Sequence, residues 1–375
     1  MREVVLIGGG HAHLVAIRRL GADRPGDVSI TLISDGPAAH YSGMLPACVA
    51  DLYHLDEIGV DLATFARGAR ISFIPARVEG MDPRENTLSF RDRPPMKYDV
   101  ASVNIGSVSR GLDTPGARKN AIPTRPLGGF LRRLDEVDQR TPVGGEPVRV
   151  VVVGGGAAGV ELAFGLDARF RGRGRRATIT ILERREEVLG DRGAAVVRIV
   201  RGLFGDRGIK VVSGSRVARV QSDSLTLATG VEIPYEIMIW ATGGGPSPFL
   251  ERTGLGRDRT GYLQVSRTLQ TSSPHVFAAG DCVSLEGHPD LPKAGVYAVR
   301  QGSILAENIL ARLKGGNLRE YAPQRGFLSL IMTGDRKAIL DWKGVAFHAG
   351  WAWRWKDWID RRWMRKLAQT RSARG

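Results

Sequence analysis

Two stretches decide the fold of this chain: VVLIGGGHAH at residues 4–13 and VVVVGGGAAG at residues 150–159. Each is a short β-branched strand that runs into a glycine turn and then into a helical pattern. In that context the glycines allow a tight turn and a close approach of the backbone to a pyrophosphate, and the helix N-terminus offers free N–H groups to the anion. Two such units in one chain predict two bound dinucleotides and a relay of electrons between them.

Polar residues follow the second strand of each unit. Ser34 and Asp35 end the strand predicted over 28–34, and Glu183 ends the strand predicted over 178–182. A polar side chain at this point of a dinucleotide-binding unit binds the ribose.

The remaining pattern repeats as well. A strand over 98–107 with a turn at Gly106 matches a strand over 236–243 with a turn at Gly243. This internal repeat predicts an α/β fold with two Rossmann-like dinucleotide-binding domains, the second inserted in the first. The expected division is 1–125 and 266–325 for the first domain, 147–265 for the second domain, and 326–375 for a C-terminal region.

Composition narrows the class of protein. Met1 lies directly before the first strand, so no signal peptide is expected, and no apolar run reaches the 18–20 residues or so that span a bilayer. Only two cysteines occur among 375 residues, which fits a reducing cytoplasm. The net charge of +15 leaves nucleic acid, anionic membranes and acidic partners open.

Part of that charge is concentrated at the C-terminus, where residues 351–375 hold eight Lys or Arg and two Asp. Aromatic and aliphatic residues recur there at spacings of three and four, which predicts one apolar face of a helix: Trp351, Trp355, Trp358, Ile359, Trp363 and Leu367. Basic residues fill much of the rest: Arg354, Lys356, Arg361, Arg362, Arg365 and Lys366. A basic amphipathic helix of this kind lies on an anionic membrane surface. The alternative is a helix packed on the protein or on a partner.

Further motifs carry a family resemblance. They are HYSGMLP at 40–46, ATG at 241–243, AGD at 279–281, KAGVYAVRQ at 293–301 and WKDWIDR at 355–361. Together with both fingerprints they resemble the pyridine nucleotide-disulfide oxidoreductase superfamily of flavoproteins. The chain looks most like the type II NADH dehydrogenase and sulfide:quinone reductase branch, in a subgroup similar to the flavoprotein module found fused to selenide, water dikinase.

The resemblance implies the cofactors and the residues that bind them. FAD is expected at the first unit, bound by Gly8, Gly10, His13, Ser34, Asp35, Gly106, Gly280 and Asp281. NADH is expected at the second unit, bound by Gly154, Gly156, Gly159, Glu183 and Gly243. A carboxylate at position 183 favours NADH, although Arg184 and Arg185 follow it and suit the 2′-phosphate of NADPH.

His13 departs from the fingerprint, which has a glycine there. Its ring either points at the FAD phosphate or packs between helix and strand. His11 and His13 do not share a helix face, so no metal site is expected.

Candidates for the reaction come from the same resemblance. Glu161 corresponds to a glutamate near the nicotinamide and flavin, and Tyr297 and Gln301 lie in a segment that borders the flavin and the acceptor. Cys48 is a catalytic thiol only under an alternative function, and it otherwise packs as a small apolar residue.

The expected function is transfer of hydride from NADH to FAD and of electrons to a second acceptor, a quinone. The expected location is the cytoplasm, at the inner face of the cell membrane. No nucleic-acid binding is expected, and whether the chain forms a homodimer is left open. The alternatives are a sulfide-, selenium- or thiol-handling flavoprotein reductase and a non-enzymatic flavin-bound docking subunit.

Overall fold

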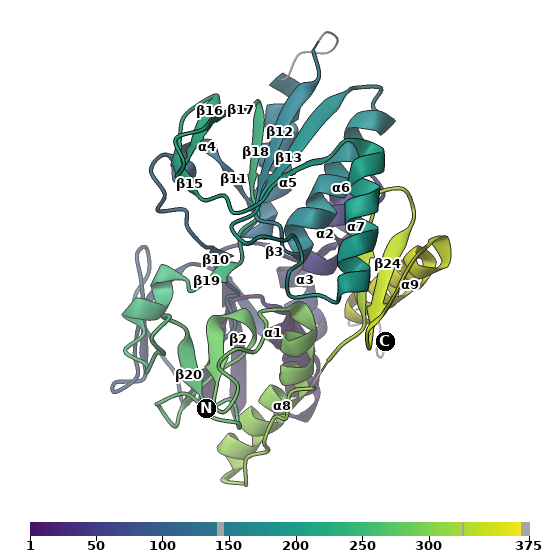
Figure 1. The fold of residues 1–375 in the computed structure, drawn as a ribbon. Helices are drawn as coiled ribbons and strands as arrows, with labels where there is room; N and C mark the ends of the chain where they lie inside the picture. Colours follow the sequence, from purple (N-terminus) through teal and green to yellow (C-terminus); the bar gives the residue numbers. More distant parts are fainter. Residues whose placement is uncertain (141–145, 325, 369–375) are drawn as a thin grey trace.

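The structure is a computed structural model that describes residues 1–140, 146–324 and 326–368. It contains two parallel five-stranded sheets, each the centre of one domain (Figure 1). The first sheet has the order β21 (Val276–Ala278), β9 (Val100–Val103), β1 (Arg2–Ile7), β2 (Val28–Ser34) and β5 (Ser72–Pro75). The second has the order β11 (Ile122–Pro123), β18 (Ile237–Trp240), β12 (Val148–Val153), β13 (Ala177–Leu182) and β14 (Lys210–Val212).

The helices connect and cover these sheets. They are α1 (His11–Asp23), α2 (Leu45–Val49), α3 (Leu62–Gly68), α4 (Ala117–Asn120), α5 (Leu127–Arg140), α6 (Ala157–Gly172), α7 (Ala194–Arg207), α8 (Gly295–Lys314) and α9 (Gly350–Ala368). Helices α1 and α8 pack against each other in the first domain, and α6 and α7 belong to the second. In a parallel sheet such crossover helices bury both faces, which is why β1 and β12 are almost entirely apolar.

Smaller sheets join these parts. The pairs are β3 (Ala38–His40) with β4 (Gly59–Asp61), β10 (Val108–Ser109) with β19 (Gly244–Gly245), and β20 (Leu263–Val265) with β22 (Val283–Leu285). The three-stranded sheets are β6 (Val78–Asp82), β7 (Thr87–Phe90) and β8 (Met96–Lys97); β15 (Val217–Val220), β16 (Ser224–Leu227) and β17 (Glu232–Pro234); and β23 (Ser329–Met332), β24 (Ala338–Trp342) and β25 (Val345–Ala349).

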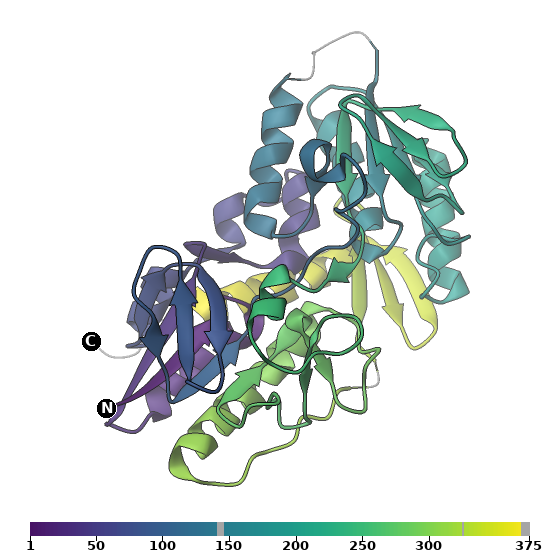
Figure 2. The same ribbon diagram turned by 90° about the vertical axis from the view of Figure 1, so that its left-hand side faces the viewer.

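The fold class predicted from the sequence is confirmed. Figure 2 shows that the lower domain combines the N-terminal residues with the light-green segment near residue 300, while the teal residues between them form the upper domain. The second domain is therefore an insertion in the first, and a C-terminal helix follows.

Two predicted boundaries shift. Ile122 and Pro123 pair with β18, so the second domain begins before residue 125. Phe249, Leu250 and Leu263 are buried in the core of the first domain, so the chain returns there before residue 265. Sequence alone placed these edges badly because short crossover segments carry no periodic pattern.

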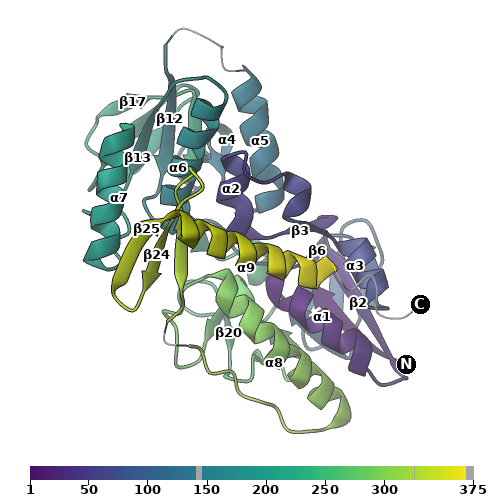
Figure 3. The same cartoon turned by 90° about the vertical axis from the view of Figure 1, so that its right-hand side faces the viewer.

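Helix α9 runs across both domains. Figure 3 shows it lying in front of α1 and beside the sheet of β24 and β25. Its first turns belong to the core of the second domain through Ala352 and Trp353, and its last turn belongs to the core of the first through Leu367. In the described residues, no helix has the length and apolarity to span a bilayer.

Candidate functional site

The first glycine turn leaves no room for side chains. A Cβ atom on Gly8, whose φ is +94°, would lie 2.6 Å from the carbonyl oxygen of Asn104, and one on Gly10 would lie 2.2 Å from Asn104 Oδ1. Helix α1 begins after Gly10 without a capping side chain. An uncapped helix N-terminus behind such a turn fits the pyrophosphate of a dinucleotide cofactor.

Asn104 organises this turn, and sequence reasoning did not single it out. Its buried Oδ1 accepts a hydrogen bond from the backbone N–H of His13 at 3.1 Å, and its Nδ2 donates to the carbonyl of Ala279 at 2.6 Å. The position corresponds to Ala241 in the second copy, and this departure from the repeat was the available signal. Asn104 thus joins the first glycine turn to the segment that carries Asp281.

His13 is a packing residue rather than a free ligand. Its ring is fully buried, with Nδ1 2.6 Å from the carbonyl oxygen of Gly8 and Nε2 2.9 Å from Ser102 Oγ. Desolvation lowers the pKa of His13 to about 4, so the ring is neutral at physiological pH. Because both ring nitrogens are engaged, the geometry corrects the assignment of this side chain to FAD and favours the packing alternative.

The second turn uses glycine at the corresponding place. A Cβ on Gly159 would lie 1.8 Å from the carbonyl oxygen of Gly154, whereas one on Gly156 would meet nothing within 4 Å. Helix α6 also starts without a side-chain cap. The residues present fit a second dinucleotide, because the open space at Gly156 lies directly at the uncapped helix end.

Glu183 lies at this second turn as predicted. Its Oε2 accepts a hydrogen bond from the N–H of Gly155 at 2.6 Å, and its Oε1 accepts one from the N–H of Arg185 at 2.8 Å. These bonds hold the carboxylate at the end of β13, where a ribose would meet it.

The Gly280–Asp281 turn is held by residues from two other segments. The buried Gln301 side chain accepts a hydrogen bond from the N–H of Gly280 at 2.6 Å. Asp281 forms an ion pair with Arg125, with 2.7 Å between Oδ2 and Nη1. Gln301 therefore positions the turn, and Arg125 is a charged neighbour that the sequence did not reveal.

Tyr297 is buried near the same turn. It packs edge-on against Phe327 with ring centroids 5.8 Å apart, and it lines a small cavity together with Asp281 and Lys293. This places Tyr297 beside Asp281, on the α8 side of the site.

A buried polar cluster lies between α6 and α9. The ammonium of Lys356 donates to Asp360 and to the carbonyl oxygen of Gly43, each at 2.7 Å, and both charged side chains are less than a tenth exposed. Glu161 accepts a hydrogen bond from the N–H of Met332 at 2.9 Å. Desolvation raises the pKa of Glu161 to about 7, with the charge of Lys356 opposing the shift, so its carboxyl exchanges a proton near neutral pH.

Tyr41 connects this cluster to the first glycine turn. Its hydroxyl is hydrogen-bonded to Asp360, and burial together with that carboxylate raises the pKa of Tyr41. Its ring meets His11 edge-on, with centroids 5.5 Å apart. Titratable groups from both units and from α9 therefore converge at the junction of the two domains.

Helix α9 has two faces, which corrects the single apolar face predicted from the sequence. The inner face packs on the protein through Trp353, Lys356, Asp360 and Leu367. The outer face leaves Trp351, Trp355 and Trp358 about half exposed, and Trp363 packs partly on the first core. Spacings of three and four fit both faces of one helix, and only the packing separates them.

Both thiols are unsuited to nucleophilic chemistry. Cys48 and Cys282 are free and buried. Desolvation raises the pKa of Cys48 to about 12 and that of Cys282 to about 11, so neither forms a thiolate near neutral pH.

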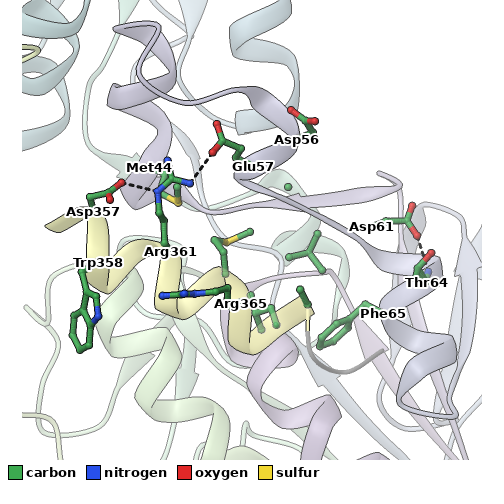
Figure 4. A pocket seen from close by; sticks show the side chains of 15 residues that line it. Met44, Asp56, Glu57, Asp61, Thr64, Phe65, Asp357, Trp358, Arg361 and Arg365 are labelled. Carbon is green, nitrogen blue, oxygen red and sulfur yellow. Dashed lines mark hydrogen bonds and ion pairs between the residues drawn. The ribbon is translucent and has the colours of Figure 1, made fainter. Parts of the chain in front are cut away.

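A cavity of about 710 Å³ opens between α9 and α3 (Figure 4). Apolar residues form one part of its walls, with Met44, Val60, Phe65 and Met364 among them, and charged residues form another: Asp56, Glu57, Asp61, Asp357, Arg361 and Arg365. Arg361 crosses one side of it in ion pairs with Glu57 and Asp357, and the exposed Trp358 stands at its edge. Since Met44 directly follows the Gly43 that binds Lys356, the cavity lies next to the polar cluster.

Residues 2–302 match the family model for pyridine nucleotide-disulphide oxidoreductases. The chain belongs to this family. The protein is accordingly an NAD(P)H oxidoreductase of a family that binds a flavin and NAD(P)H.

Several known proteins are similar over nearly the whole chain. NADH dehydrogenase-like protein YutJ of Bacillus subtilis is 24% identical over 90% of this chain and 91% of its own length. Demethylphylloquinone reductase NdbB of Synechocystis is 24% identical over 92% and 87%.

Solved structures share the fold. Sulfide:quinone oxidoreductase of Aquifex aeolicus superposes with a TM-score of 0.82 at 21% identity, covering 99% of this chain and 92% of that one. NDH2 of Plasmodium falciparum in complex with NADH gives 0.80 at 13% identity, covering 97% and 98%. The predicted resemblance to the type II NADH dehydrogenases is confirmed.

Proposed function

We propose that this protein is an NADH:quinone oxidoreductase that uses FAD and works at the surface of a membrane. FAD, bound at the first turn, would supply the chemistry of accepting hydride and passing electrons on. The chain itself holds both cofactors, excludes water and provides protonatable groups at the junction.

The proposed preference for NADH rests on Glu183. Its carboxylate is fixed at the end of β13 by the N–H groups of Gly155 and Arg185. A carboxylate held there accepts hydrogen bonds from ribose hydroxyls and repels the 2′-phosphate of NADPH.

The observation that carries the quinone as acceptor is the large, partly apolar cavity beside a polar cluster that contains no reactive thiol. An apolar cavity with a few convergent polar groups suits a hydrophobic ring with two oxygens. The raised pKa values of Cys48 and Cys282 argue against the thiol-handling alternative. Similar proteins named as demethylphylloquinone and sulfide:quinone reductases support the same acceptor class.

The polar cluster suits the protons that quinone reduction consumes. A quinone takes up two electrons and two protons, and hydride from NADH carries only one proton. Glu161, with a pKa of about 7, holds or releases a proton at its carboxyl near physiological pH. Lys356 fixes the Gly43 carbonyl and Asp360 and keeps a positive charge next to Glu161.

Membrane binding at the cytoplasmic side is proposed from the outer face of α9. Three tryptophans are exposed there among Arg354, Arg362 and Arg365, which are exposed too. Tryptophan favours the bilayer interface, and basic side chains near an anionic surface each contribute about 1 kcal/mol.

Turnover of the purified, FAD-loaded protein tests the function. NADH with a short-chain quinone should give steady turnover, and Cys48→Ser should change the rate less than about twofold because its thiol is protonated and buried. Turnover with sulfide or a disulfide instead of quinone, and its loss in Cys48→Ser with FAD still bound, would favour the thiol-based alternative. Reduction of FAD without any acceptor activity would favour a docking subunit.

A further inference from the structure

The β24–β25 hairpin presents an exposed apolar surface that the sequence did not predict. Trp342 is 41% exposed, Val345 49% and Phe347 56%. Among the described residues, six of the ten exposed large apolar side chains lie between residues 342 and 358, on this hairpin and on the outer face of α9. Such clustering differs from the scattered apolar residues of an ordinary surface.

The register puts these hairpin side chains on one face of the sheet. Trp342 pairs with Val345 and Leu340 with Phe347, and directly opposite residues of an antiparallel pair point the same way. The other face carries Asp341, which contacts Arg192, and His348, which contacts Thr333. Because α7 packs on the sheet and Arg207 from it binds Thr333 and Asp335, that other face is the one turned toward the second domain.

The exposed face of the hairpin lies on the same side of the molecule as α9. Helix α9 packs against β24 and β23, and Phe347 lies only four residues before Trp351 in the sequence. Figures 1 and 3 both show the hairpin and α9 side by side on that side.

The hairpin also holds its side chains rigidly. Lys343 and Gly344 form its two-residue turn with φ values of 50° and 84°, the combination of a type I′ turn that keeps both strands paired up to Trp342 and Val345. The Lys343 ammonium lies over the Trp342 ring, 5.5 Å from its centroid. An apolar tip with its own cation is therefore presented in a fixed geometry.

We infer that the β24–β25 hairpin inserts into an anionic lipid surface together with the outer face of α9, so that the protein contacts the bilayer through two elements. This inference rests on the proposed membrane location. The occupant is a lipid surface because tryptophan and phenylalanine alternate with exposed Lys343, Arg354, Arg362 and Arg365, and such a mixture complements acidic headgroups above acyl chains. Two elements fix the orientation of the protein, and the cavity whose edge is Trp358 then faces the lipid.

Vesicle binding of the full-length, FAD-loaded protein tests the inference. The hairpin variant is Trp342→Ser with Phe347→Ser. Its matched control is Val211→Ser with Val231→Ser, two exposed residues of the second domain that lie in β14 and directly before β17. On phosphatidylcholine vesicles that contain phosphatidylglycerol, the hairpin variant should lose roughly tenfold or more in partitioning, because it removes two interfacial aromatic side chains. The control should bind as the unchanged protein does, and all three should reduce FAD with NADH equally.

A local probe gives an independent readout. Because Cys48 and Cys282 are buried, an environment-sensitive dye on Phe347→Cys reports the hairpin alone. Its emission should shift to the blue on anionic vesicles, and the same dye on Val231→Cys should not shift.

The outcomes separate the inference from the function. Equal vesicle binding of the hairpin variant, without a dye shift, overturns the inference and leaves the α9 surface and the quinone activity standing. A change in oligomeric state of the hairpin variant in the absence of vesicles overturns it in favour of a contact between copies of the chain. If the unchanged protein does not reduce quinone, the proposed function is overturned, independently of the vesicle-binding result.

Discussion

The two glycine turns of this protein pack a helix against a strand in two different ways. In both, the first glycine sits against the backbone of the neighbouring strand, at Asn104 in the first turn and at Ala241 in the second. At the last position of the fingerprint, Gly159 lets α6 come into contact with the turn, whereas His13 fills the gap and bridges Gly8 to Ser102.

The difference teaches that the fingerprint fixes the turn but not the packing behind it. The first turn depends on buried hydrogen bonds from His13 and Asn104, and the second depends on the absence of a side chain. Val15, two residues after His13, aligns with Glu161, two residues after Gly159. Val15 packs against Gly302, whereas Glu161 lies in the polar cluster under α9. Equivalent positions therefore serve packing in the first unit and hold a buried, titratable carboxyl in the second.

The largest effect is expected from Gly159→Ala. Its Cβ would overlap the Gly154 carbonyl oxygen, so the turn and the helix end must move apart. NADH-dependent reduction of the flavin, followed by stopped flow, should fall by about 100-fold or more, since a misplaced turn no longer positions the nicotinamide. Gly172→Ala, on the same helix with open space around it, is the control. Equal rates of flavin reduction for Gly159→Ala and Gly172→Ala would show that the second turn tolerates a side chain at its last position, as the first turn does at His13.

His13→Gly gives the first turn the fingerprint of the second. The ring is fully buried, so its removal leaves a cavity, and the hydroxyl of Ser102 and the carbonyl of Gly8 lose their partner. The free energy of unfolding, measured by denaturant titration, should drop by about 2–4 kcal/mol. Ser102→Ala added to His13→Gly should recover part of that loss. A more stable His13→Gly variant would mean that the histidine serves the cofactor rather than the packing.

Glu161→Gln tests the chemical role of the second unit. Because the pKa of the folded-state carboxyl is raised from 4.5 to about 7, the folded protein binds a proton that the unfolded chain releases between those values. The stability of the unchanged protein should therefore fall as pH rises from about 4.5 to about 7, relative to Glu161→Gln, by on the order of 1–3 kcal/mol. The exposed Glu286→Gln should show no such difference from the unchanged protein. Parallel stability curves for Glu161→Gln would remove Glu161 as a proton-exchanging group.

The smallest effect concerns the ends of β2 and β13. The N–H groups of Gly8 and Gly154 bond to the residues before Ser34 and Glu183, so these two positions are equivalent. Glu183→Ala should narrow the preference for NADH over NADPH by about tenfold, measured as the ratio of kcat/KM values, because the repulsion of the 2′-phosphate is lost. Ser34→Ala should leave the ratio unchanged. A preference for NADPH in the unchanged protein would assign the ribose site to Arg184 and Arg185.

The sequence predicted the elements that carry strong local patterns. The two strand–turn–helix units and the terminal helix that became α9 follow from glycine turns and from periodicity. The sequence also located Glu183 at the second turn, because this residue directly follows a strand whose end is visible in the local pattern. The hydrogen-bond partners of His13 and Gln301 did not follow from local pattern, since they lie 89 residues away at Ser102 and 21 residues away at Gly280.

By itself, the sequence determined that this chain forms two dinucleotide-binding units, because strands, tight turns and helix starts are local properties of adjacent residues. Only the tertiary structure decided which face of α9 is buried, that Lys356 and Asp360 pair beneath it, and that these groups meet Glu161 and Tyr41. The physical reason is that both faces of α9 carry tryptophan and charge at helical spacing. Which face is desolvated depends on the surfaces of the two domains that the helix crosses, and these surfaces form only when distant segments have packed.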